Sequence, residues 1–206
     1  MAITTYSELK TAIANWLNRD DLTSVIPDFI SLNEADMDRR IRHWRMEKRV
    51  TASVDGQYTG LVGDFVEGIR FAITGSDYER IELISQADMQ QRRFANSDTS
   101  GVPQFYAISD GQLELYPTPD ATYTVEMLYY GQITPLSDSN TTNWALTHHP
   151  DVYLYGSLIH AAPYLGEDQR AGTWGSLYQS ALDAINKESS DAKFGGSGRR
   201  LKIAAY

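Results

Sequence analysis

Two changes in the spacing of apolar residues constrain the fold of this chain more than any other feature. In residues 6–18 apolar side chains recur every three or four positions, which predicts a helix. The same spacing predicts a second helix that begins between residues 23 and 27 and ends near Arg45. Short segments rich in valine, isoleucine, threonine and aromatic residues follow, and helical spacing returns near Pro150. The expected order is therefore helix, strand, helix.

The central segments are predicted to be the strands of an antiparallel module. Expected strands cover residues 50–54, 58–62, 68–73, 78–84, 105–109, 112–116 and 123–131. Asp110-Gly111 is a sequence favoured in two-residue hairpin turns, so the last three strands are expected to form a meander. A serine followed by an acid three positions later predicts one short helix, from Ser85 to about Arg93.

Two further helices are predicted in the last third of the chain. The first starts at Pro150, a residue suited to a first helical turn, and ends between Pro163 and Gly166. The second starts at residues 167–168 and carries helically spaced apolar residues as far as Ile185. Within it Gly172 and Gly175 cost about 1 kcal/mol each, and they would allow a neighbouring helix to approach closely.

These elements predict an α+β fold, in which N-terminal and C-terminal helices form a helical bundle with an inserted antiparallel β module and an extended C-terminal tail. The expected parts are the N-terminal helices in residues 1–45, the β-rich module in 46–146, the C-terminal helices in 147–190 and a flexible or partner-ordered tail in 191–206. The tail is expected because Gly195-Gly196-Ser197-Gly198 does not favour regular secondary structure.

The charge of the chain is unevenly distributed. The 206 residues include 18 basic and 27 acidic side chains, and the formal charge of −9 argues against broad affinity for nucleic acid. Residues 191–206 hold four basic residues and one acid, which leaves 14 basic and 26 acidic residues before them. Residues 39–49 form a second basic cluster of six basic residues with Glu47. Its position at the end of a predicted helix, after several acids, is also explained by the helix dipole.

Composition disfavours several classes of protein. Without cysteine the chain has no disulfide framework, no thiolate zinc site and no cysteine nucleophile. No apolar run approaches the roughly 18 residues of a membrane span. The first ten residues also lack the basic-then-apolar pattern of a signal peptide. We therefore expect a protein made in the cytoplasm that does not contact a membrane.

The search for reactive groups predicts no catalytic, metal or cofactor site. The histidines do not have the helical spacing, with a glutamate, that zinc hydrolases use; they are His43, His148, His149 and His160. Glu126 with Asp110 or Glu114 could flank a glycosidic bond, but charge on the outer face of a sheet is the more common explanation. No serine nucleophile elbow, Walker loop or dinucleotide fingerprint occurs.

Aromatic residues and the tail point instead to protein interfaces. The 13 tyrosines and 4 tryptophans combine a large apolar surface with a polar tip, although a share of them is needed for the core. In residues 200–203 basic and apolar side chains alternate with the period of a strand, after the flexible glycine run. Such a segment either adds to a partner's sheet or groove, or is a disordered terminus.

In its β segments and helix starts the sequence resembles the head-to-tail adaptor, or connector, proteins of tailed bacteriophages. The resemblance covers about residues 6–185. It rests on the hairpin residues 103–108 and 113–119, on residues 123–131, on Asn143-Trp144, on the helix entry at 149–156 and on the N-terminal residues 6–9 and 26–30. These are packing and turn signatures and not catalytic motifs.

The resemblance implies a structural protein of the virion and not an enzyme. Related adaptors form a ring of twelve subunits under the portal protein, extend the DNA channel without sequence-specific binding, and dock the tail or nozzle protein. Their location is the neck between capsid and tail, and they are made in the host cytoplasm. Their C-terminal segments reach the portal, which implies portal contacts here for Phe194, Arg199, Arg200, Leu201, Lys202, Ile203 and Tyr206. The β module would then face the tail.

Two other classes of function stay open at this point. The first is a peptidoglycan-degrading enzyme located in the neck, whose carboxylates would catalyse hydrolysis. The second is a different virion protein, such as a tail or baseplate subunit, or a nucleic-acid-binding module that uses residues 39–49. Binding through phosphate contacts would weaken steeply with salt concentration, which distinguishes the nucleic-acid module from an adaptor.

Overall fold

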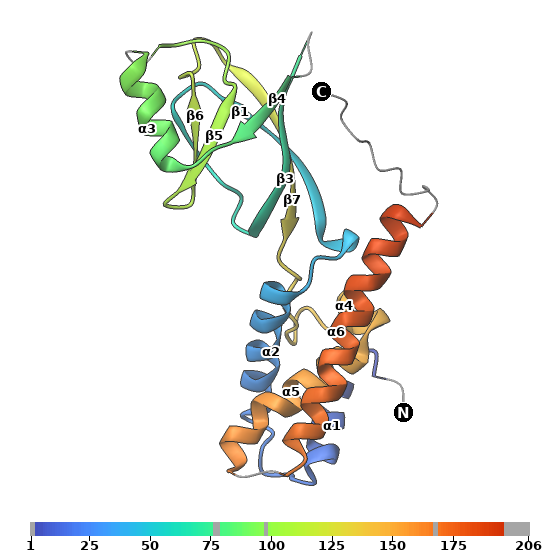
Figure 1. The fold of residues 1–206 in the computed structure, drawn as a ribbon. Coiled ribbons are helices and arrows are strands. Elements are labelled where there is room, and N and C mark those ends of the chain that lie inside the picture. The colour runs from blue at the N-terminus through green and yellow to red at the C-terminus, as the bar shows by residue number, and fades with distance from the viewer. Residues whose placement is uncertain (1–2, 76–78, 97–98, 167–168, 196–206) are drawn as a thin grey trace. The chain divides into compact units, whose positions relative to one another are not determined.

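The chain divides into two compact units in a computed structural model that describes residues 3–75, 79–96, 99–166 and 169–195 (Figure 1). Unit 1 comprises residues 1–46 and 133–206, and unit 2 comprises residues 47–132. The domain boundary expected at residue 146 stays a prediction. In the structure, residues 133–146 make their contacts with unit 1 and are grouped with it. Among the described residues, no helix is both long enough and apolar enough to cross a membrane.

Unit 1 contains five of the six α-helices found in the described residues. They are α1 (Tyr6–Leu17), α2 (Ile26–Arg40), α4 (Trp144–His148), α5 (Pro150–Leu165) and α6 (Ala171–Phe194). A short 3-10 helix, η1, covers Trp44–Met46. The start of α1 is set by a capping box, in which Thr5 and Glu8 each accept a hydrogen bond from the other's backbone amide.

The second helix ends earlier than the spacing of its apolar residues predicts. Ile41 has an extended backbone, with φ −96° and ψ 132°, and its side chain is fully buried. Because the backbone is extended at Ile41, α2 stops at Arg40, and the predicted end near Arg45 is wrong. The next helical residues, Trp44–Met46, belong to the separate helix η1.

Unit 2 contains the strands and one helix. The strands are β1 (Glu47–Val54), β2 (Tyr58–Gly60), β3 (Phe65–Thr74), β4 (Glu79–Leu83), β5 (Phe105–Ser109), β6 (Gln112–Tyr116) and β7 (Tyr123–Gly131), and helix α3 spans Gln86–Ala95. Their order in the sheet is β1-β7-β3-β4-β5-β6-β2. The hairpin between β5 and β6 is confirmed, with φ +50° at Asp110 and +68° at Gly111.

This topology overturns the predicted fold class. The protein is α+β, but it is not a terminal helical bundle with an inserted antiparallel module, because helices and strands are interspersed and the seven-stranded sheet is mixed. Strand β4 pairs with β5 in parallel, and helix α3 provides the crossover that a parallel pair requires. The predicted meander is also wrong, since β7 pairs with β1 and β3 and not with β6.

The main apolar core of unit 2 lies between its strands. Its buried side chains come from six of the seven strands and are Val54, Phe71, Ile73, Ile81, Tyr106, Leu113, Leu115, Val125, Met127 and Tyr129. Because strands β1 and β6 contribute to the same core although they lie far apart in the sheet order, the sheet must curl around it. A smaller cluster of Met89, Ala107 and Tyr116 packs α3 against this sheet.

The core of unit 1 includes a close crossing of α2 and α5. A Cβ atom at Gly156 of α5 would collide with the side-chain amide of Asn33 in α2. Asn33 is fully buried, and its Nδ2 atom lies 3.3 Å from the carbonyl oxygen of Val152. The predicted close approach at Gly172 and Gly175 is wrong, because a Cβ atom at either position would meet no atom within 4 Å.

Two carboxylates of α2 hold the segment that returns from unit 2. The backbone amide of Ile133 donates to Asp38 at 2.9 Å, and that of Leu136 donates to Glu34 at 2.8 Å. The hydroxyl of Tyr153 donates to the same oxygen of Glu34 at 3.0 Å. Glu34 is buried, and burial raises its pKa although the two hydrogen bonds act in the opposite direction.

The raised pKa of Glu34 predicts a pH dependence of stability. A carboxyl group whose pKa is higher in the folded state contributes stability that is full below its unfolded pKa and is lost as pH rises through the folded value. Glu34→Gln removes this titration and keeps an acceptor oxygen. We expect the variant to gain unfolding free energy relative to the wild type over the pH range that begins at the ordinary carboxyl pKa of 4.5 and rises through the folded value. Urea denaturation of both proteins across this range measures it, and parallel profiles would contradict it.

Candidate functional site: helix α6 and its attachment

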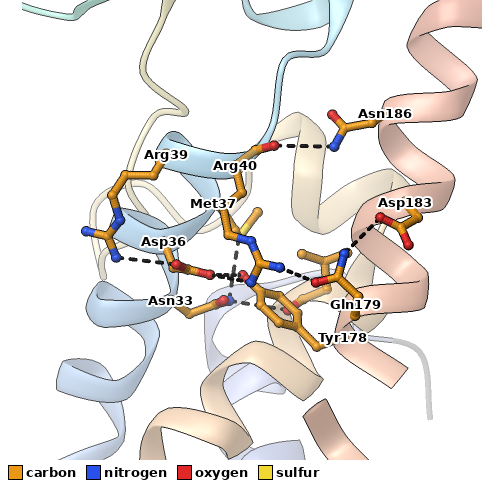
Figure 2. A network of polar contacts seen from close by, with 10 residues as sticks. Asn33, Asp36, Met37, Arg39, Arg40, Tyr178, Gln179, Asp183 and Asn186 are labelled. Carbon is orange, nitrogen blue, oxygen red and sulfur yellow. Dashed lines mark hydrogen bonds and ion pairs between the residues drawn. The ribbon is translucent and has the colours of Figure 1, made fainter. Parts of the chain in front are cut away.

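Helix α6 is attached to α2 by a network of polar side chains (Figure 2). The carboxylate of Asp36 accepts a hydrogen bond of 2.9 Å from the hydroxyl of Tyr178 and lies 3.2 Å from Nη1 of Arg40. The guanidinium of Arg40 also donates to Gln179, whose amide donates to Asp183 at 2.8 Å. The network therefore joins the middle of α6 to the last turns of α2.

Asp36 is the centre of this network, and its charge is retained there. Burial acts to raise the pKa of Asp36, but the hydrogen bonds from Tyr178 and Arg40 outweigh it, so the pKa is lowered. Burial and the neighbouring carboxylate raise the pKa of Tyr178. The pair at neutral pH is therefore a carboxylate and a neutral phenol.

Two further side chains extend the attachment toward the carboxyl end of α6. The side chain of Asn186 accepts a hydrogen bond of 3.1 Å from the amide of Arg42 and lies 3.3 Å from the carbonyl oxygen of Arg40. The buried hydroxyl of Ser189 accepts a hydrogen bond of 3.0 Å from the amide of Trp44. These contacts fix the end of α6 on the chain that leaves α2.

A cluster of His43, His149 and Glu188 lies beside these contacts. The Nε2 atoms of the two histidines are 3.7 and 3.6 Å from different oxygens of the Glu188 carboxylate. Both nitrogen atoms are buried, and neither has a hydrogen-bond partner among the described residues. The ring of His43 stacks on Trp144 with 4.9 Å between ring centroids.

Both histidines of this cluster are held in their neutral form. Burial lowers the pKa of His43 and of His149, and it outweighs the nearby carboxylate of Glu188, which acts in the opposite direction. The amide of Arg45 donates a hydrogen bond of 3.2 Å to Nδ1 of His43. The proton of neutral His43 is therefore on Nε2 in this arrangement, directed at Glu188.

The described part of α6 ends at a residue predicted to contact a partner. Phe194 is the last residue of the helix, and 53% of it is exposed. The other predicted contacts lie outside the described residues; they are Arg199, Arg200, Leu201, Lys202, Ile203 and Tyr206. Their role stays a prediction.

Comparison with protein families gives a match along most of the sequence. The model of the SU10 adaptor protein family matches residues 4–201. The chain belongs to the SU10 adaptor protein family. The resemblance to phage head-to-tail adaptors is thereby confirmed, and membership makes this adaptor a structural protein and a component of the phage virion. No curated protein is similar enough to the chain to count as a match.

In this adaptor the basic cluster of residues 39–49 is occupied by contacts within the chain. Arg39 and Arg40 pair with Asp36, and Arg42 donates to the carbonyl oxygens of Asp38 and Ile41. In unit 2 the ammonium group of Lys48 pairs with Asp64, and Arg49 pairs with Glu126. Since the cluster is divided between the units and four of its six basic side chains pair with carboxylates, the structure does not favour a nucleic-acid site there.

The carboxylates suggested for glycoside hydrolysis also have other partners. Glu114 is 2% exposed, and it accepts hydrogen bonds of 3.0 Å from Arg93 and 3.1 Å from Gln57. Glu126 lies 2.8 Å from Arg70 and 3.6 Å from Arg49. A general acid needs access to its substrate, whereas Glu114 is buried and Glu126 is held between two arginines, so the structure does not favour either carboxylate for that role.

Sequence analysis missed the contacts of α6, because their members are far apart along the chain. His43, His149 and Glu188 come from three segments and do not form a local motif. The one available signal in the sequence was that the last helix has polar residues that could pair with the acidic and basic residues of α2. That pairing cannot be assigned until it is known which helices pack together.

Proposed function

We propose that this protein is a head-to-tail adaptor of the phage neck, between capsid and tail. Twelve copies would form a ring beneath the portal protein, extend the DNA channel and dock the tail or nozzle protein. The observation that carries the proposal is the match to the adaptor family over residues 4–201, which includes more than half of the basic tail. DNA would pass through the ring without sequence-specific binding.

The attachment of α6 supports a role for the tail in binding the portal. Asp36, Asn186 and Ser189 hold the helix along its length, so the tail starts from a fixed point. Phe194 adds an exposed aromatic ring at that point. A segment that becomes ordered on binding makes weak single contacts, but a ring would present many copies of it at once.

The charge distribution supports the same proposal. The residues before the tail carry 14 basic and 26 acidic side chains, and an acidic surface repels the phosphates of passing DNA. The tail carries the opposite charge and would bind an acidic edge of the portal. An adaptor needs this separation because it must hold a protein neighbour without retaining DNA.

Deletion of residues 196–206 tests the proposal. Ending the chain at Gly195 keeps the hydrogen bond from its amide to Asp191, so α6 retains its last turn. We expect the unfolding free energy to change by no more than about 0.5 kcal/mol, because the last buried residue of the described chain, Ser189, is retained. Binding to purified portal, measured by sedimentation and by electron microscopy of ring assembly, should be lost.

A second variant separates sequence recognition from charge. A chain whose last 11 residues are scrambled keeps the length and charge of the tail. If the tail makes sequence-specific contacts, the scrambled variant should bind the portal as poorly as the deletion does. If the contact is purely electrostatic, the scrambled variant should bind normally and lose binding in high salt. Undiminished portal binding by the deleted chain would refute the role of the tail.

A further inference from the structure

We propose that His43, His149 and Glu188 form a binding site for a divalent transition-metal ion, with Zn²⁺ as the best-suited ion. The proposal goes beyond the adaptor function and does not depend on ring formation. It rests on two buried imidazole nitrogen atoms that lack hydrogen-bond partners among the described residues and lie near one carboxylate. One of the two, on His43, belongs to a side chain that is fully buried.

The arrangement of ligand atoms is close to what zinc requires. One ligand atom from each of the three residues lies within 4.8 Å of the other two, and the nitrogen-to-oxygen distances are 3.6 and 3.7 Å. Zinc binds imidazole nitrogen and carboxylate oxygen at about 2.0–2.2 Å, so its tetrahedral ligands lie roughly 3.4 Å apart. Glu188 is half exposed and can move to close the remaining gap, and water would provide the fourth ligand.

The charge and protonation of the site also suit a cation. Neutral imidazole is the form that binds metal, and burial keeps both histidines neutral. Binding through Nε2 requires the proton of His43 to move to Nδ1, and Nδ1 can then no longer accept the hydrogen bond from the amide of Arg45. The exchange gives up one hydrogen bond and gains a bond to the metal.

The site would connect three segments that carry the attachment of α6. His43 follows α2, His149 lies at the start of α5, and Glu188 belongs to α6, one residue before Ser189. A bound ion would therefore hold the carboxyl end of α6 where the tail begins. The expected effect is a more stable unit 1 when metal is present.

Zinc binding to the full chain tests the site directly. Protein without a histidine tag, treated with chelator and dialysed, is titrated with ZnCl₂ in a calorimeter and then melted with and without zinc. We expect one ion per chain. At a zinc concentration about 100 times the dissociation constant, we expect the melting temperature to rise by roughly 5 °C. Substitution with Co²⁺ should give the visible absorption of tetrahedral coordination.

Matched variants decide whether these residues are the ligands. Glu188→Gln and His149→Gln should weaken zinc binding at least about tenfold and abolish the thermal shift, because each removes one of three ligands. Both positions are partly exposed, so the variants should fold. His148→Gln, at the exposed neighbouring histidine, should bind zinc like the wild type. Absence of binding, or equal binding by Glu188→Gln, would overturn the proposal.

Discussion

Gly156→Ala is expected to lower the free energy of unfolding by about 3 kcal/mol, at the upper end of the usual effect of overpacking a core. The added methyl group would occupy the position of the Asn33 side chain, where α2 and α5 cross. Asn33 cannot easily move, because it is fully buried and its amide donates to backbone carbonyls of α5. Chemical denaturation of the variant, followed by far-ultraviolet circular dichroism, measures the loss.

Other glycines in the helices provide matched controls for this variant. Alanine at Gly172 or Gly175 meets open space, so each substitution should raise the unfolding free energy by about 0.5–1 kcal/mol through helix propensity. A double variant that combines Gly156→Ala with Asn33→Ala should recover part of the unfolding free energy lost in Gly156→Ala, because it removes the colliding side chain. Additive losses in the double variant would show that the collision is not the cause.

Arg93→Met is expected to destabilise unit 2 by about 3–5 kcal/mol, the cost of leaving a buried charge without its partner. Arg93 is the main cationic partner of Glu114, which is 2% exposed. The same guanidinium donates to the carbonyl oxygen of Leu115 at 2.8 Å and to Thr118 at 3.2 Å. Loss of the guanidinium leaves Glu114, Leu115 and Thr118 without this donor. Thermal melting of the variant should therefore show a lower transition temperature.

The neighbouring arginine is the natural comparison. Arg92 lies over the ring of Phe105 at 4.0 Å, a contact that contributes about 0.5–1 kcal/mol at an exposed site, so Arg92→Met should have a small effect. Removing both charges with Arg93→Met and Glu114→Leu should cost less than Arg93→Met alone. If the double variant is the less stable of the two, the unpaired charge is not the origin of the loss.

Local patterns were enough to predict most individual elements. The strands at residues 105–109, 112–116 and 123–131 have the predicted bounds, because turn residues and β-branched or aromatic residues mark each end. The apolar spacing in residues 6–18 likewise predicted α1, which spans Tyr6–Leu17. These signals depend on residues within a few positions of one another, so a single sequence contains them.

Pairing between distant segments could not be predicted in the same way. The sequence between β6 and β7 resembles an ordinary turn, yet β7 crosses to lie between β1 and β3. The parallel pairing of β4 with β5 depends on where α3 packs, and Met89, Ala107 and Tyr116 decide that through burial. The candidate site was missed for the same reason, because His43, His149 and Glu188 meet only after the helices pack.

The two ends of unit 2 lie on neighbouring strands. Glu47, the first residue of β1, is paired with Tyr130 near the end of β7, so their Cα atoms are roughly 5 Å apart. A linker of a few residues could therefore join Met46 to Ile133 and leave out the entire unit. The same proximity would let recombination exchange this segment for another whose ends are equally close. Such an exchange would replace the strand-rich unit and keep the five helices of unit 1.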